Sequence, residues 1–191
     1  LVDIDGTPYP EVDPSVPIGG ISFEQMNQQD RQISQELQLL GDSGGLKWIA
    51  GAFYFTEKNH DLTVSTTATT QGETENDSYA LYGEGDYAIS DDLTVNAGLR
   101  YTWDTRSIST HLFNSAGTTC TLTADQRDTP TECTLSRTAK FDYLSYTLGL
   151  DYKFTDSIFG YAKTSRAFRA GGFNHRQIGP AYRPERVTNY E

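Results

Sequence analysis

Basic side chains gather in one short stretch near the C-terminal end of the sequence. Residues 163–186 hold six of the fifteen Lys and Arg residues but only one acidic residue. Planar guanidinium groups bind carboxylates and other anionic oxygens through paired hydrogen bonds. The stretch therefore predicts a binding site for an anionic small molecule, with Arg166, Arg169, His175 and Arg176 as the candidate contacts. The alternative interpretation is that these arginines pair with acidic side chains of the protein itself, among them Glu84, Asp86 and Asp151.

The only two cysteines, Cys120 and Cys133, lie in a Thr-rich stretch. In an oxidising compartment such a pair forms a disulfide, and closing a ring of about this size stabilises the fold by ~3 kcal/mol. Two free thiols or a metal site are the alternatives. The histidines His60, His111 and His175 could converge on a metal ion, but scattered histidines are more often solvated surface residues. We therefore expect a disulfide, no metal and no other cofactor.

Other kinds of chemistry find no matching motif. The sequence contains no G-x-S-x-G, H-E-x-x-H, Walker or dinucleotide-binding motif, so we expect no enzymatic activity. The net charge is −11, and no basic, aromatic-rich face emerges that could neutralise phosphates, which argues against a nucleic-acid partner. No apolar run approaches the ~20 residues that a membrane-spanning helix requires.

The elements that must position these side chains are β-strands with one apolar face. Apolar residues occupy every second position from residue 93 to residue 103, and a second alternating segment covers residues 144–154. A strand of about this length crosses ~25 Å of bilayer at a tilt of about 45°. The apolar face of a barrel strand contacts lipid. We therefore predict lipid contact for the apolar positions of both segments: Leu93, Val95, Leu99, Tyr101, Trp103, Leu148, Leu150 and Tyr152.

Turn lengths predict how these strands pair. The segment before Leu93 alternates in the same way, which predicts a hairpin with Tyr79 opposite Trp103. After the second alternating segment, a three-residue turn at 155–157 places Lys163 on the polar face of the return strand.

The connections between the expected strands are alternately short and long. The short ones are residues 41–45, 90–92 and 155–157, and the long polar ones are 57–77, about 105–140 and 171–191. This alternation is typical of outer-membrane barrels, which have short periplasmic turns and long extracellular loops. The predicted fold is all-β: an antiparallel transmembrane β-barrel segment of about six strands. The alternative is a secreted, soluble β-rich module that binds a carbohydrate or a partner and buries its apolar face as a core.

Several motifs resemble one known family. ISQELQLL followed by LKWIAGAFYF, then YALYGEGDYAISDDLTVNAGLRYTWD, FDYLSYTLGLDYKFTDSIFGYAKTSRAFRAGGFN and PERVTNYE are similar to the barrel of TonB-dependent outer-membrane receptors, and they occur in the family's order. The resemblance implies a roughly 22-stranded barrel closed around a plug domain, in the outer membrane of a Gram-negative bacterium. It implies import of a scarce nutrient, most often a ferric siderophore, driven by the TonB–ExbB–ExbD system. Outer-membrane lipid and that small molecule are the other expected partners.

The resemblance also sets the expected domain organisation. Residues 1–30 contain four prolines and little periodicity, and they are expected to form an irregular extracellular loop. Residues 31–191 are expected to form an incomplete part of the barrel domain, without the plug domain. Because bacterial single-chain barrels need at least about eight strands, about six strands cannot close one. We therefore expect a fragment of a larger transporter.

Overall fold

The computed structural model describes residues 2–3, 23–174 and 179–191. These residues form one antiparallel sheet in which every strand pairs with the next strand along the chain. They contain no helix that is long and apolar enough to cross a membrane. The strands are β1 (Val2–Asp3), β2 (Phe23–Ser43), β3 (Leu46–Ser65), β4 (Ala68–Ala88), β5 (Leu93–Asn114), β6 (Leu135–Thr155), β7 (Ile158–Arg169) and β8 (Glu185–Tyr190).

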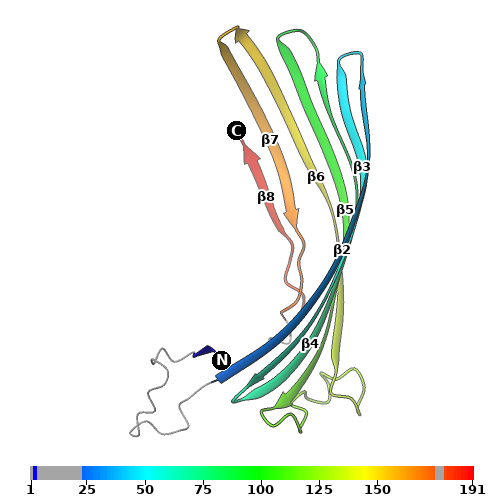
Figure 1. Ribbon diagram of the computed structural model, residues 1–191, viewed down its shortest axis with the longest axis vertical. Coiled ribbons are helices and arrows are strands. Elements are labelled where there is room, and N and C mark those ends of the chain that lie inside the picture. Colours follow the sequence, from blue (N-terminus) through cyan, green and yellow to red (C-terminus); the bar gives the residue numbers. More distant parts are fainter. Residues whose placement is uncertain (1, 4–22, 175–178) are drawn as a thin grey trace.

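The sheet curves like a section of a barrel wall (Figure 1). The short turns of the β2–β3, β4–β5 and β6–β7 hairpins lie at one end, the top of Figure 1. The longer β5–β6 and β7–β8 connections lie at the other end, together with the two-residue β3–β4 turn. Strands β2 to β7 are each at least 12 residues long and correspond to the six strands expected, while β1 and β8 are short additions. The all-β antiparallel fold expected from the alternating segments is therefore confirmed. Because the described strands form a single sheet, they do not make the two-layer sandwich of the soluble alternative.

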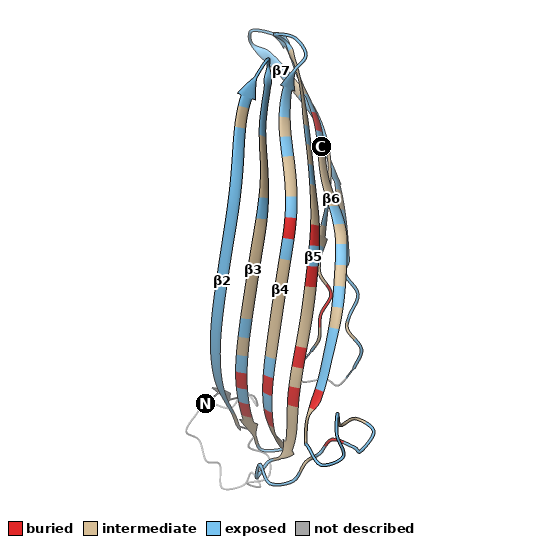
Figure 2. Cartoon of the chain, turned by 90° about the vertical axis from the view of Figure 1, so that its right-hand side faces the viewer, coloured by how far each residue is buried: buried red, intermediate tan, exposed pale blue. Residues whose placement is uncertain are grey.

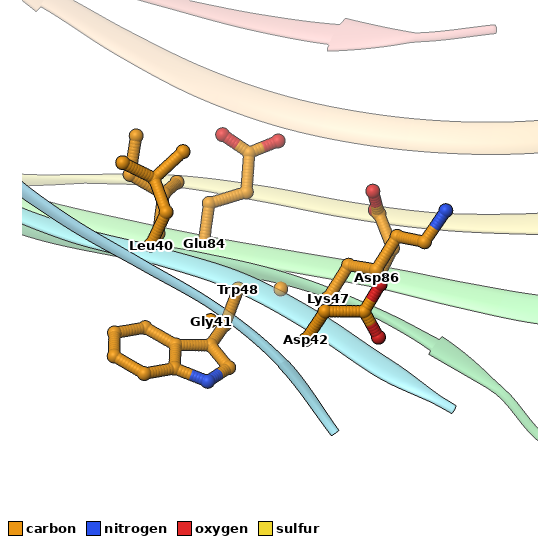
Figure 3. Close-up of a pocket in the computed structure, with 9 residues that line it drawn as sticks. Leu40, Gly41, Asp42, Lys47, Trp48, Glu84 and Asp86 are labelled. Atoms are coloured by element: carbon orange, nitrogen blue, oxygen red, sulfur yellow. The ribbon is translucent and has the colours of Figure 1, made fainter. Parts of the chain in front are cut away.

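The two faces of the sheet differ in chemistry. We call the side that faces β7 and β8 the inner face; Glu84 and Asp86 point to it, whereas Trp48 points to the opposite, outer face (Figure 3). Buried positions gather on β3, β4 and β5 toward the loop end, whereas β2 is exposed along nearly its whole length (Figure 2). The outer face exposes large apolar side chains: Leu99 is 58% exposed and Leu148 is 51% exposed. Exposing so many large apolar side chains to water costs free energy, so a face of this kind favours an apolar environment.

The predicted pairing of β4 with β5 is confirmed. Tyr79 lies opposite Trp103, and Leu81 lies opposite Tyr101. Aromatic rings meet at this level of the outer face, where the ring centroids of Tyr101 and Trp103 lie 4.7 Å apart. Aromatic rings of this kind mark the interface between lipid and water in barrels.

The turn between β6 and β7 differs in one detail from the prediction. The loop has only two residues, Asp156 and Ser157, because Thr155 pairs with Ile158. A bulge between Lys153 and Thr155 takes up the remaining residue. The predicted register beyond the bulge is therefore kept, and Lys163 lies opposite Gly149 on the inner face.

The predicted long connections are wrong in extent, because the strands run well past the aromatic level. Residues 57–77 belong almost entirely to β3 and β4, with only residues 66–67 between the strands. The stretch 105–140 contributes to both β5 and β6, so that its loop shrinks to residues 115–134. Residues 171–191 include β8, and residues 23–30 of the expected N-terminal loop belong to β2. The rest of that expected loop, apart from Val2 and Asp3, lies outside the described residues.

Polar pairs on the outer face explain why these extensions escaped prediction. Beyond the aromatic level, Lys58 contacts Glu75 at 2.6 Å and His60 contacts Glu73 at 3.3 Å across β3 and β4. The hydrogen bond that Lys58 donates to the Glu75 carboxylate raises the pKa of Lys58, which keeps the ammonium group charged. Both faces are polar here, so apolar and polar residues do not alternate along these parts of the strands. The backbone pairing alone extends the strands.

The loop between β5 and β6 is cross-linked and folded on itself. A disulfide joins Cys120 to Cys133, with their Cα atoms 5.6 Å apart. Arg127 donates hydrogen bonds from Nε and Nη2 to the carbonyl of Leu122, at 3.1 and 3.0 Å. Leu122 itself is only 2% exposed. The loop is therefore a small packed unit at the end of the sheet.

Removing this disulfide should loosen the loop and leave the sheet intact. We expect the Cys120→Ser/Cys133→Ser variant to be cut within residues 115–134 at least ~10-fold faster by a protease, because a ring of this size contributes ~3 kcal/mol. Cleavage of intact cells or outer-membrane vesicles, followed by mass spectrometry, measures this rate. Equal cleavage of the wild type and the variant would contradict the expectation. The Thr118→Ser variant, which changes the loop without touching the disulfide, is the control.

Candidate functional site

The candidate site is built on a row of alternating residues of β5. Arg100, Thr102, Asp104 and Arg106 lie two positions apart, so they all point to the inner face. Asp104 is 3% exposed and Thr102 is 4% exposed, whereas a quarter of the Arg106 side chain is exposed. The row therefore places a buried carboxylate between two guanidinium groups.

Asp104 holds its neighbours in place. The hydroxyl of Tyr143, on β6, donates to Oδ2 of Asp104 at 2.6 Å. Nη2 of Arg106 lies 3.8 Å from Oδ1 of the same carboxylate. The ring of Tyr143 stacks on Phe168, with the centroids 5.2 Å apart. Phe168 can reach this ring because the pairing of β6 with β7 ends two residues earlier.

Arg100 lies between aromatic rings on the same face. Its guanidinium carbon is 5.1 Å from the ring centroid of Phe53 and 5.8 Å from that of Tyr82. Its Nε donates to the hydroxyl of Thr102 at 3.3 Å. Stacking of this kind fixes the plane of a guanidinium group without neutralising its charge.

Two hollows of the inner face meet at Arg106. The first, about 290 Å³, is lined by Arg100 and by several aromatic rings as well as by Arg106. The second, about 310 Å³, brings Arg106 together with Arg169, the last residue of β7. Arg106 borders both hollows and is therefore at the centre of the site.

One donor of Arg106 lacks a partner. Its Nε is buried and makes no hydrogen bond with any described residue. A buried donor of this kind costs about 1–3 kcal/mol, so native structures seldom leave one unmatched.

The structure separates the four residues predicted to contact an anionic ligand. Arg169 borders the second hollow beside Arg106. Arg166 instead lies opposite Tyr146, with its guanidinium carbon 5.4 Å from that ring's centroid. Arg166 does not line the two hollows at Arg106, but it lines a third hollow of about 390 Å³ together with Arg100. His175 and Arg176 lie outside the described residues.

Two carboxylates named as alternative arginine partners have other contacts. Nδ2 of Asn96 donates to Asp86 at 3.2 Å and to Asp151 at 3.0 Å. Near Asp86, a wider hollow of about 620 Å³ is lined by Glu84 and Lys47, among others (Figure 3). This end of the inner face, near the short turns, holds both acidic side chains and the lysines Lys47 and Lys163, while the arginines of the site lie nearer to the loop end.

The residues predicted to contact lipid all lie on the outer face. The pairing of β4, β5 and β6 places them in register, and Leu150 lies opposite Val95. The hydroxyl of Tyr101 donates to Asp142 at 2.6 Å, at the level where the apolar side chains end. The predicted positions on this face are Leu93, Val95, Leu99, Tyr101, Trp103, Leu148, Leu150 and Tyr152.

The histidines do not gather at a site in the described part of the chain. His60 contacts Glu73, and Nδ1 of His111 lies 3.1 Å from both the carbonyl of Cys133 and the hydroxyl of Thr134. Among the described residues, no group of three His, Cys, Asp or Glu side chains could hold a metal ion.

Sequence reasoning missed Asp104, Arg106, Tyr143 and Phe168. The first two lay in or beside an expected loop, and the signal for them was that polar positions of β5 continue in step with Arg100 and Thr102. For Tyr143 the signal was an aromatic ring at a position that alternates with the apolar ones. Nothing in the sequence connects Phe168 with Tyr143, because that contact depends on where two strands separate.

A family comparison and a structural comparison both return matches for this chain. The family described as "TonB dependent receptor-like, beta-barrel" matches residues 5–191 of the sequence. Among solved structures, the chain is similar to the ferric yersiniabactin uptake receptor FyuA from Yersinia pestis, with a TM-score of 0.75 and 17% sequence identity. The match covers 88% of this chain and 26% of that receptor, so the chain spans about a quarter of the receptor's length. At this identity the likeness establishes the fold alone.

Proposed function

The chain belongs to the TonB-dependent receptor family, and on that premise we propose that the protein imports a ferric siderophore across the outer membrane. Receptors of this family lie in the outer membrane of Gram-negative bacteria, and they are transporters rather than enzymes. In the proposed reaction the chelate binds from the cell surface and enters through the barrel. No covalent chemistry is required of the residues described.

The observation that carries the proposal is the pair of arginines at one hollow of the inner face. Arg106 and Arg169 come from different strands and line the same space of about 310 Å³. Ferric chelates often retain negative charge on carboxylate or catecholate oxygens, which guanidinium groups bind with directional hydrogen bonds. The hollow lies toward the loop end of the sheet, which is the extracellular end when the short turns are periplasmic.

We propose that the energy for import comes from the TonB–ExbB–ExbD system of the inner membrane. A chelate bound tightly enough to be captured from dilute solution leaves slowly, so its release needs a second source of energy. Membership of the family supports this coupling. Loss of uptake with retained surface binding in a strain without TonB is the expected result.

The outer face is proposed to contact lipid. A nitroxide label at Leu148 should be relaxed by lipid-soluble oxygen more strongly than by a water-soluble nickel reagent, because its neighbours on that face are exposed apolar residues. A label at Thr147, which points to the inner face, should show the reverse order and is the matched control. Power-saturation measurements on the full-length receptor in lipid vesicles give both ratios. Equal accessibility at the two positions would contradict the proposed orientation.

The substrate itself is tested by direct titration. The full-length receptor in outer-membrane vesicles is titrated with radiolabelled ferric siderophores, cobalamin and oligosaccharides, and the retained label is counted. We expect saturable binding of a ferric chelate. Binding of cobalamin or sugars alone would keep the transporter and discard iron as its cargo.

A further inference from the structure

We propose that the outer face holds one phosphorylated glycolipid of the cell-surface leaflet at a defined site. An acyl chain of this lipid lies in an apolar hollow that spans β2, β3 and β4, and a phosphate group binds Arg31. The site lies on the face opposite to the hollows at Arg106, so the inference goes beyond import. It rests on the proposed contact of the outer face with lipid and is independent of the cargo.

A small side chain opens the hollow. Ala52, on β3, lies between Leu37 of β2 and Leu81 of β4 on the outer face. Because both leucines are longer than Ala52, they border a space of about 480 Å³, which is within the roughly 300–1,000 Å³ of small-molecule sites. Leu37 is 70% exposed and Leu81 is 56% exposed. An acyl chain in the hollow therefore covers apolar surface on both sides.

Aromatic rings border the hollow toward the loop end. Tyr54, Tyr79 and Trp103 all belong to its lining. The ring centroids of Tyr54 and Tyr79 lie 4.9 Å apart, and Trp103 lies opposite Tyr79. Such rings mark the interface between lipid and water, so the hollow lies just inside the hydrocarbon. The loop end is the extracellular end when the short turns are periplasmic, which assigns the hollow to the cell-surface leaflet.

An arginine beyond the rings supplies the positive charge. Arg31 shares the outer face of β2 with Leu37, is exposed, and makes no hydrogen bond or ion pair with the residues that the structure describes. Lys58 lies directly opposite Arg31, but its ammonium group is 2.6 Å from Glu75. Like charges directly opposite each other destabilise a sheet, so an anion at Arg31 is favourable. A guanidinium group binds phosphate oxygens through paired hydrogen bonds.

The acidic side chains of this region do not occupy the place of the phosphate. Three of them lie on the outer face of β4: Glu73, Glu75 and Asp77. The first two contact His60 and Lys58 of β3. Arg31 lies one strand further away, on β2. The charge therefore changes from negative on β4 to positive on β2, and an anionic headgroup is bound on the β2 side.

The spacing between Arg31 and the hollow fits a lipid. Gln35 belongs to the lining and lies four positions after Arg31 on β2. Four residues of a strand span about 13 Å, or about 9 Å along the bilayer normal at a tilt of about 45°. The headgroup layer is about 5–7 Å deep, and a long basic side chain can extend back toward it. One lipid can therefore contact both the hollow and the guanidinium group.

The test titrates the full-length receptor in a nonionic detergent and counts bound lipid by native mass spectrometry. The probes are lipid A with its phosphates, the same lipid A after removal of the phosphates, and phosphatidylglycerol. We expect phosphorylated lipid A to bind at least ~10-fold more tightly than the dephosphorylated form. It should also bind more tightly than phosphatidylglycerol, because a phosphate monoester carries a charge of about −1.5 to −2 and a phosphodiester only a single charge.

Two pairs of variants locate the lipid. Arg31→Gln should lose about tenfold in affinity for phosphorylated lipid A alone, whereas Arg137→Gln, the same change on the inner face of β6, should bind as the wild type does. Ala52→Phe fills the hollow and should weaken both forms of lipid A about tenfold. Its matched control is Ala50→Phe, on the same face of β3 but outside the lining, which should leave both affinities unchanged.

Each part of the inference can fail separately. Equal binding of the two forms of lipid A, or equal losses in Arg31→Gln and Arg137→Gln, would overturn the phosphate contact. Equal losses in the two alanine variants would overturn the hollow, provided that heat-dependent gel mobility finds both barrels folded. Tighter binding of phosphatidylglycerol would overturn the glycolipid. Lipid contact itself, and with it this inference, would be overturned by the spin-label measurement at Leu148, whereas the titration with ferric siderophores tests the cargo independently.

Discussion

Replacing Leu148 with arginine should destabilise the folded barrel by about 2–4 kcal/mol. Leu148 lies on the outer face between Leu144 and Tyr152, near the middle of the apolar part of β6, and it is 51% exposed. An arginine there must place its charge in hydrocarbon or bend the bilayer toward it, and the free energy of unfolding falls by that cost. Equilibrium unfolding of the full-length receptor in urea, in phospholipid vesicles, measures the change.

The matched control for this prediction is Thr147→Arg. Thr147 is the preceding residue of β6 and points to the polar inner face, opposite Ser165. We expect its free energy of unfolding to change by less than about 1 kcal/mol, because a charge on that face stays hydrated. If both variants lost the same stability, the assignment of the two faces would be wrong.

Replacing Arg106 with glutamine should weaken binding of an anionic ferric chelate by ~10- to 100-fold. The variant keeps a side chain of similar length but removes the guanidinium charge of the residue that borders both hollows. Hydrogen bonds to a charged group contribute about 1.5–3 kcal/mol, which corresponds to this range of affinity. Titration of vesicles that contain the full-length receptor measures the dissociation constant.

Two further variants show whether the effect belongs to the site. Arg169→Gln removes the second arginine of the same hollow, and we expect a smaller loss, since its side chain is more exposed than that of Arg106. Lys58→Gln makes the same change of charge on the outer face, where Lys58 pairs with Glu75, and it should leave the affinity unchanged. If Lys58→Gln weakened binding as much as Arg106→Gln, the net charge of the receptor, and not this site, would set the affinity.

The side chains that share one face of a strand could be predicted from the sequence, because this depends only on counting residues. In a strand every second side chain points the same way, so the apolar positions around Leu99 and Leu148 had to share one face. A short turn allows only a few registers between the two strands. The register with Tyr79 opposite Trp103 is the one that places the apolar side chains of both strands on the same face. The alternation of apolar residues and the length of the turn were therefore sufficient to predict the apolar face and the register.

The extent of the strands could not be predicted in this way. Beyond the aromatic level both faces carry polar side chains, and pairs such as Lys58 with Glu75 replace the apolar alternation. There the backbone hydrogen bonds of neighbouring strands continue the sheet, and these bonds are not visible in any one segment. Residues near the strand ends, Arg106 among them, were therefore assigned to a loop.

The sequence by itself determined the family, the all-β fold and the direction in which the apolar side chains point. Only the tertiary structure decided which charged residues form a site. Arg106 and Arg169 come together because β5 and β7 lie on the same curved sheet, whereas Arg166, which lies opposite Tyr146, lines a different hollow with Arg100. Contacts between strands that are distant along the chain depend on curvature and on where pairing ends. Periodicity in the sequence carries no information about either.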